Sequence, residues 1–507
     1  MATMTAPPKT TALGPIRLQF PNLITKAPLP KKLLRATPAG TADTNGWDTV
    51  FAIPVQYVNQ AIVDAEASPT TFQQSDSTLS ASITGTFGDW QIAIGGSGEL
   101  LAMTVPIPSA TLTFANQDYP MTNLTATILV NLTYVEQSNV ANGQGYNLQV
   151  NPQPAGGTPA VIMETLLPVN SNSMLQLVTE QLLLEWLNAN LASFAYVFNT
   201  VNLNMQADQA QWQWLMPTTV AYAYAADPGG SLNNSTFAVL CMTQNKLAPT
   251  PQVSPYAIPP GAQAGFCINT ADYLGNLMLP MMPQLFSGAS ASDFTYETSG
   301  GILTNTNPVN MDPVSVNGSD KTPTVPTGGL SVSVTGSEVE IAVTNLHVEF
   351  SPGIDIYVNY TQWYQLSIYN QSAGTQTIIF NQSTVPGHTE AASSHSVEIA
   401  TWVTVTEIVA SLIAATIGVV VGIAGPMATI AMKIVVGLII AVVLNVITNI
   451  PQYMNIAANN DWDKLPPINA MVTNATNPVT WPGGTDFTPT SAQLNASLQL
   501  GGTLNFA

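Results

Sequence analysis

The chain has 507 residues, of which 46% are apolar and only 8% are charged, and its formal net charge is −19. A chain of this length can hold two or three domains with separate hydrophobic cores, and this composition excludes an intrinsically disordered protein. The acidic balance argues against nucleic acid as the main ligand, because the phosphates of a nucleic acid would be repelled.

Residues 1–45 form a basic, proline-rich arm. Six of the ten basic residues lie before residue 36, no acidic residue precedes Asp43, and the rest of the chain carries 4 basic against 29 acidic side chains. This asymmetry predicts an interaction segment, which could lie on the acidic body of the protein, on a partner protein or on anionic lipid. The candidate contacts to a partner or an anionic surface are Lys26, Lys31, Lys32 and Arg35.

Residues 46–305 are predicted to contain a short helix, a meander and a long helix. Apolar residues at helical spacing follow Pro54, which suits a first helical turn. From about Thr78 to Ile162, apolar and polar residues alternate between Gly, Asn and Pro breaks, which predicts an antiparallel meander. The segment 173–198 carries a wide apolar stripe, which predicts a long helix.

Four residues in this part have structural interpretations. Cys241 and Cys267 lie in apolar segments typical of strands, and we expect buried free thiols there, with a disulfide as the alternative. Trp47 and Trp90 lie beside apolar strand or helix residues, which favours packing anchors over ligand contacts.

Residues 306–328 are interpreted as a linker, because Asn, Pro and Gly are frequent there and no periodicity is present. Residues 329–507 alternate again on both sides of an apolar run at 408–447. The order of elements predicts an α+β fold in which strongly curved antiparallel sheets wrap long apolar helices.

The apolar run at 408–447 contains a single charge, Lys433, and Gly425-Pro426 divides it into two halves. We expect a helical hairpin, since proline interrupts the helical hydrogen-bond ladder. Three interpretations stay open: a buried core hairpin, a hairpin stored in the soluble form and released into a membrane, and a constitutive membrane span. The candidate lipid or membrane contacts are Leu412, Val420, Ile423, Met427, Leu438 and Ile439.

Several motifs occur in one order along the chain. They are NGWDTVFAI, GTFGDWQIAIGGSGELLAMTVPI, FAVLCMTQN, QVSPYAIPPGAQAGFCIN, LGNLMLPMMPQLF, LHVEFSPG and LNASLQLGG. In this number and order they resemble the forty-seven-kilodalton protein family of botulinum-type OrfX toxin gene clusters. The resemblance spans about Gly46 to Phe506 and leaves only the basic arm without a counterpart.

The resemblance implies a fold of the tubular lipid-binding type, called TULIP, and contact with lipid or a membrane surface. It implies a bacterial toxin accessory or an insecticidal protein, with other toxin-cluster proteins as further partners. The alternative is a structural subunit of a toxin complex, with a closed tunnel and no lipid. Because the first thirty residues lack a continuous apolar run, we expect no Sec signal peptide and a cytoplasmic location or release by a non-classical route.

We expect no enzyme activity and no cofactor. The family that the chain resembles has no established catalytic residues to transfer to this sequence. The three histidines lack the spacing of a zinc helix, and neither a nucleophile elbow nor a calcium loop occurs.

Overall fold

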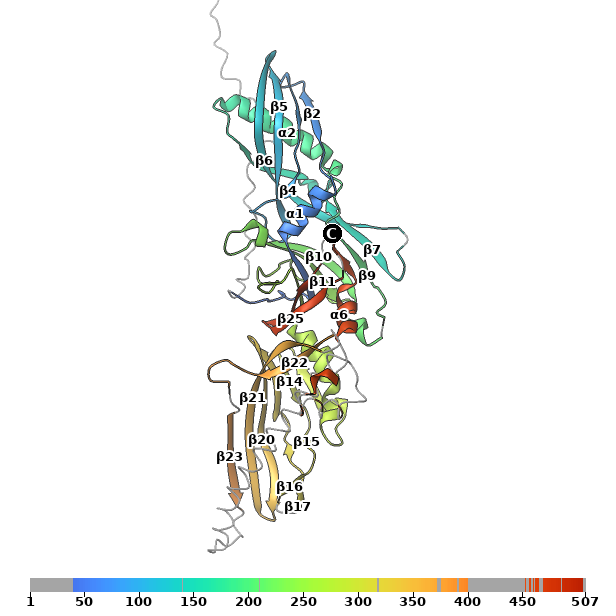
Figure 1. Ribbon diagram of the computed structural model, residues 1–507, viewed down its shortest axis with the longest axis vertical. Helices are drawn as coiled ribbons and strands as arrows, with labels where there is room; N and C mark the ends of the chain where they lie inside the picture. Colours follow the sequence, from blue (N-terminus) through green and yellow to red (C-terminus); the bar gives the residue numbers. More distant parts are fainter. Residues whose placement is uncertain are drawn as a thin grey trace, which may run out of the picture. The chain divides into compact units, whose positions relative to one another are not determined.

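The computed structural model describes residues 40–504 (Figure 1). Within that span it leaves out residues 139, 209, 317–318, 372–374, 390–391, 400–451, 453–455, 457–458, 460, 465–467 and 485. The basic arm up to residue 39 and the apolar run at 408–447 therefore lie outside the described residues. So do the three open interpretations of that run.

The predicted meander forms the core of a nine-stranded antiparallel sheet. Its long hairpin turns at Ala115 and Asn116, which have φ angles of 49° and 59°, as a two-residue turn matched to strand twist requires. The sheet order is β2 (Thr71–Asp76), β3 (Ala81–Thr86), β5 (Leu100–Phe114), β6 (Gln117–Glu136), β7 (Gln144–Val150), β9 (Asn199–Leu203) and β24 (Val479–Thr480), with β4 (Gln91–Ile92) on β5 and β8 (Val161–Leu167) on β6.

A second, six-stranded sheet brings together segments that are far apart in the sequence. Two of its central strands, TVFAIP and TFAVLCMT, are mostly apolar and buried at every position, as expected of strands covered on both faces. The last strand pairs with one that precedes it by more than two hundred residues. The sheet order is β10 (Pro217–Ala225), β11 (Thr236–Thr243), β1 (Thr49–Pro54), β12 (Ala264–Asn269), β26 (Ser497–Thr503) and β25 (Thr488–Leu494).

A third, nine-stranded sheet contains most strands between residues 294 and 399, and two of the strands there form a separate two-stranded sheet. Its main path is β13 (Phe294–Glu297), β14 (Ile302–Asn305), β19 (Leu330–Thr335), β20 (Glu338–Ser351), β18 (Thr324–Val325) and β15 (Val309–Asn310). Strand β21 (Ile354–Asn370) pairs with β20, β22 (Gln376–Gln382) and β23 (Ala392–Ile399), and β16 (Val314–Val316) pairs with β17 (Ser319–Lys321). Residues 306–328 thus contain four short strands, while the predicted domain boundaries stay predictions.

The helices of the described residues are few and mostly short. The predicted amphipathic helix is confirmed as α1 (Val55–Asp64), which follows Pro54. The others are α2 (Ser173–Asn190), α3 (Thr270–Asp272) and α6 (Asn469–Thr476). Short 3-10 and π turns are η1 (Ala155–Gly157), η2 (Leu191–Ser193), η3 (Ala210–Leu215), η4 (Leu232–Asn234), η5 (Tyr273–Met278), η6 (Leu279–Leu285), η7 (Ala291–Asp293) and η9 (Trp462–Lys464).

Helix α2 ends earlier than the predicted boundary at residue 198. Beyond η2 the backbone extends, and burial alternates, with Phe194, Tyr196 and Phe198 all 3% exposed or less. This period of two places three aromatic rings in the core, which a continued helix could not do, because its side chains repeat every 3.6 residues.

The prediction of sheets wrapped around long apolar helices is wrong for the described residues. The longest described helix, α2, packs against β2, β3 and β8, while Met174 and Ala189 on it are exposed. Within the described residues, no helix combines the length and apolar character that a membrane crossing requires. Aromatic rings such as Trp90 on Phe194 and Phe237 near Trp481 fill the interior of these curled antiparallel sheets instead.

The predictions of buried free thiols and of tryptophan packing anchors are confirmed. Cys241 and Cys267 are buried free thiols. Trp47 and Trp90 are 1% and 0% exposed and belong to two separate core clusters.

Candidate functional site

The site residues predicted from the sequence all lie outside the described residues. This applies to the arm residues Lys26, Lys31, Lys32 and Arg35 and to the apolar-run residues Leu412, Val420, Ile423, Met427, Leu438 and Ile439. Their roles in partner or lipid contact stay predictions.

The described residues contain a concentrated patch of exposed apolar side chains, which we call the apolar patch. It comprises Leu167, Val169 and Met174, which are 52%, 68% and 46% exposed. Among the described residues, six large apolar side chains are more than 40% exposed, and three of them fall within the eight positions 167–174. The segment that carries the patch runs from the end of β8 to the first turn of α2, and Figure 1 labels α2. Such clustering marks an interaction surface more often than scattered exposed residues do.

A pocket of about 170 Å³ lies beside the patch. It is bounded by β6, by the end of β8 and by the first half of α2. Its lining residues are Met121, Thr122, Leu124, Leu166, Pro168, Val169, Asn170, Gln176 and Thr179. Apolar side chains with a few amide and hydroxyl groups form the type of wall that binds small apolar groups.

Hydrogen bonds fix the loop that carries the patch. The Asn172 side chain caps α2 by accepting from the backbone N–H of Met174 at 3.0 Å. Gln176 accepts from the Asn170 N–H at 2.7 Å and donates to the Leu166 carbonyl at 3.1 Å. The loop is therefore held at both ends, and its apolar side chains stay exposed in a defined arrangement.

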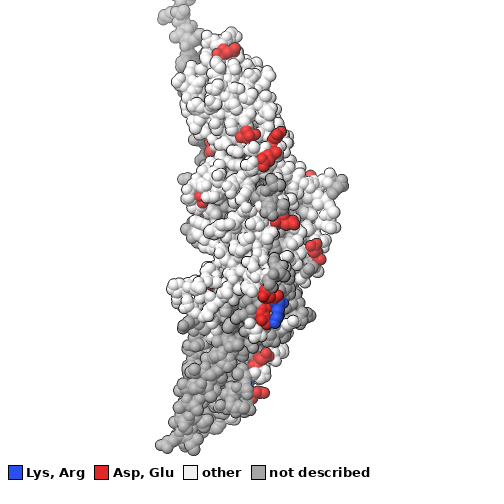
Figure 2. Space-filling model, viewed as in Figure 1, with Lys and Arg blue, Asp and Glu red and all other residues white. Residues whose placement is uncertain are grey.

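The described residues that surround the patch include an acidic group, and no basic side chain comes from residues 40–245. Residues 36–245 include neither Lys nor Arg. The Gln176 amide also donates to the Glu180 carboxylate at 2.6 Å, which places an acidic group beside the pocket. In the face drawn in Figure 2, carboxylates are scattered over the part that holds β5 and α2, and no basic side chain is visible there.

Sequence reasoning missed this patch for a local reason. The segment ETLLPVNSNSMLQL runs from the end of the predicted meander into the predicted helix, and its apolar residues suit either element. Leu166 is 3% exposed, whereas the next residue, Leu167, is 52% exposed. The two leucines differ in exposure because successive side chains of a strand point to opposite faces. The signal in the sequence was the presence of apolar residues between the predicted meander and the predicted helix.

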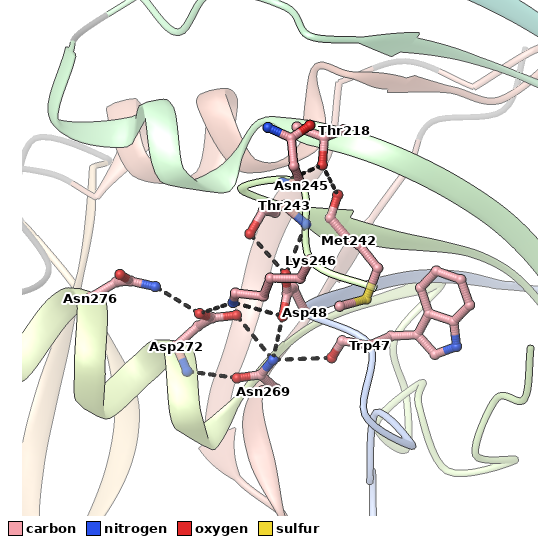
Figure 3. A network of polar contacts seen from close by, with 10 residues as sticks. All are labelled: Trp47, Asp48, Thr218, Met242, Thr243, Asn245, Lys246, Asn269, Asp272 and Asn276. Carbon is pink, nitrogen blue, oxygen red and sulfur yellow. Dashed lines mark hydrogen bonds and ion pairs between the residues drawn. The ribbon is translucent and has the colours of Figure 1, made fainter. Parts of the chain in front are cut away.

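A second notable feature is a buried polar network at one end of the six-stranded sheet (Figure 3). The ammonium of Lys246 lies 3.0 Å from an Asp48 carboxylate oxygen and 2.6 Å from an Asp272 carboxylate oxygen. The two carboxylates are 3% and 5% exposed, whereas the lysine side chain is 37% exposed. The network joins the start of β1, the turn after β11 and the short helix α3.

Neutral donors complete the network. Asp48 accepts from both the N–H and the hydroxyl of Thr243, at 2.8 and 2.9 Å. The Asn269 amide donates to both carboxylates at 3.0 Å, and the Asn276 amide donates to Asp272 at 2.7 Å. The donors and acceptors of the network satisfy one another's hydrogen-bonding capacity, so its role is to hold these segments together.

The two carboxyls of the network differ in acidity. Burial and the adjacent Asp48 raise the pKa of Asp272, Lys246 opposes them, and the net result is a pKa of about 6. Burial also acts upward on Asp48, but hydrogen bonds with Asp272, Thr243 and Lys246 outweigh it and hold its pKa below the usual value. The pKa of Lys246 is raised, because its hydrogen bonds to both carboxylates outweigh burial. Asp272 therefore takes up the first proton on acidification.

Asp272→Asn is expected to remove part of the pH dependence of folding. The folded-state pKa of about 6 lies above the ordinary 3.8, so the folded protein binds the proton more tightly. The resulting stabilisation is complete below about pH 4 and is lost as the pH rises through 6, with an amplitude on the order of 3 kcal/mol. Urea unfolding from pH 4 to 7.5 should show a shallower profile for Asp272→Asn than for wild type, and parallel profiles would contradict this assignment.

Two histidines of the described residues pair with carboxylates. His347 on β20 lies 2.6 Å from Asp355, and His388 lies 2.7 Å from Glu338. His347 lies within strand β20, and the pairing of β20 with β21 brings Asp355 close to it. In the described part of the chain, no group of three or more metal-ligating side chains converges.

Comparison with known proteins identifies the family. The family model described as OrfX-like, Protein OrfX2/OrfX3/P47, matches residues 44–502. The chain belongs to this family. The family that the motifs predicted is thereby confirmed, and it is that of the OrfX and P47 proteins of botulinum toxin gene clusters. The apolar patch and the buried network both lie within the matched residues.

Individual relatives agree with this assignment. The chain is 30% identical over 375 residues to Protein OrfX3 of Paraclostridium bifermentans, covering 67% of this chain and 75% of the relative. It is 26% identical over 507 residues to Protein OrfX3 of Clostridium botulinum (strain Kyoto / Type A2), covering 91% and 98%. The structure of P47 from Clostridium botulinum A2 superimposes with a TM-score of 0.60 at 16% identity, covering 92% and 99%, which shows a shared fold.

Proposed function

We propose that this OrfX-like protein contacts lipid or a membrane surface through the apolar patch and acts without catalysis. The observation that carries the proposal is the group of exposed side chains Leu167, Val169 and Met174 beside an apolar pocket. A fixed loop that presents three apolar side chains to solvent has a binding partner more often than not. The role within a toxin cluster, as accessory to a toxin or as an insecticidal protein, is proposed from the family alone.

The size of the patch sets the strength of the contact. Full burial of one large apolar side chain contributes about 1.5–3 kcal/mol, and the patch residues are about half exposed, so each contributes roughly 1 kcal/mol. Three such side chains give about 3 kcal/mol, which is less than one buried acyl chain provides. The patch alone therefore supports reversible contact, and stable attachment requires a second point of contact.

Val169→Asp is expected to weaken vesicle binding about tenfold, since it places a charge where an apolar group would enter lipid. Flotation of full-length protein with phosphatidylcholine vesicles measures the effect. Val135→Asp is the matched control, because Val135 is 41% exposed on β6 and lies outside the patch. Circular dichroism must show that both variants fold.

The assembly alternative predicts different results. If the protein never floats with vesicles and native mass spectrometry shows a lipid-free oligomer or a complex with other toxin-cluster proteins, the patch is a protein interface. Equal loss of binding in Val169→Asp and Val135→Asp would also contradict the proposal, because the effect would then be unspecific.

A further inference from the structure

We infer that the apolar patch selects membrane surfaces that carry no net negative charge and that its occupant is the interface of a zwitterionic phospholipid. This inference rests on the proposed function and specifies its lipid class. It is argued from the charged groups near Leu167, Val169 and Met174 and from the hydrogen bonds that fix their loop.

The patch is arranged before it binds. Asn172 caps α2 immediately before Met174, and the side chain of Gln176 holds the loop from Asn170 to the end of β8. Preorganised side chains lose little conformational freedom on insertion, so contact with hydrocarbon requires no rearrangement of the backbone.

Residues 36–246 offer no free basic side chain to an anionic headgroup at this position. Residues 36–245 contain neither Lys nor Arg, and Lys246 is engaged by Asp48 and Asp272. Proteins that recognise anionic membranes place several basic residues beside the inserted group, each of which adds to the attraction. The apolar patch is therefore repelled by anionic lipid rather than attracted to it.

The charged group beside the pocket suits a headgroup with an outer cation. The Glu180 carboxylate accepts from Gln176, which lines the pocket, so it lies one helical turn from Gln176 on α2. Choline and ethanolamine headgroups end in a cation, and a carboxylate bonded to a pocket-lining side chain complements that charge. Charge complementarity thus favours a zwitterionic surface over both an anionic surface and a second acidic copy of this chain.

The test separates the patch from the basic arm. All measurements use the full chain with the six basic arm residues changed to Gln, so that their charges do not attract anionic vesicles; these are Lys9, Arg17, Lys26, Lys31, Lys32 and Arg35. Flotation is compared with and without Val169→Asp on phosphatidylcholine vesicles and on mixed phosphatidylcholine and phosphatidylglycerol vesicles, at about 0.15 M salt, where charges interact over roughly 8 Å.

The expected result is a patch-dependent binding constant that falls severalfold when phosphatidylglycerol is added and recovers at high salt. Patch-dependent binding that increases on anionic vesicles overturns this inference and leaves the proposed function standing. Absence of patch-dependent binding on either vesicle overturns both. Concentration-dependent dimerisation that Val169→Asp abolishes overturns the lipid assignment in favour of a second copy.

Discussion

Asp48→Ala is expected to lower the free energy of unfolding by about 3 kcal/mol, because removing one partner leaves buried polar groups without an acceptor. Asp48 accepts from Thr243, Lys246 and Asn269, and its carboxylate is 3% exposed. The estimate stands at the low end for a buried pair, since the Lys246 side chain is 37% exposed and water can reach its ammonium. Urea unfolding at pH 7 measures the loss.

Asp461→Ala is the matched control. Asp461 lies 2.6 Å from Lys464, but their side chains are 41% and 66% exposed. An ion pair in water contributes less than about 1 kcal/mol, so this variant should unfold almost as wild type does. Equal losses in the two variants would show that burial of Asp48 does not determine its contribution.

The local elements of the fold were predictable, whereas their arrangement was not. The meander and the helix at residue 173 follow from alternation and from an apolar stripe, which are properties of short segments. What covers an apolar face does not follow from the same pattern. The predicted covering by long helices failed because aromatic residues such as Phe194 and Phe198 leave α2 and enter the core as extended chain.

The two candidate sites escaped prediction for a related reason. Asp48 lies in a motif that marks the family, yet its basic partner, Lys246, is 198 positions away in sequence. Only the pairing of β1 with both β11 and β12 brings the residues of the network together, and such long-range pairing is not encoded in local periodicity. Exposure of Leu167 beside the buried Leu166 depends in the same way on which face of β8 meets the core.

Trp90→Ala is expected to lower the free energy of unfolding by about 3–5 kcal/mol, because it leaves a cavity in the largest core cluster. Trp90 is 0% exposed, its ring stacks on Phe194 with centroids 5.1 Å apart, and the Phe87 ring meets it edge-on at 5.6 Å. Its backbone N–H donates to the Ser68 hydroxyl at 2.9 Å, which the substitution leaves in place. Thermal or urea unfolding measures the effect.

Trp90→Phe separates packing from hydrogen bonding at this position. Within the described residues, no acceptor lies within hydrogen-bond distance of the Trp90 indole nitrogen. Loss of the indole N–H should therefore cost nothing, and the smaller aromatic ring should lower stability by only about 1 kcal/mol. If Trp90→Phe is as unstable as Trp90→Ala, the N–H contributes a hydrogen bond of its own. If both variants are as stable as wild type, the ring contacts with Phe194 and Phe87 do not anchor this core.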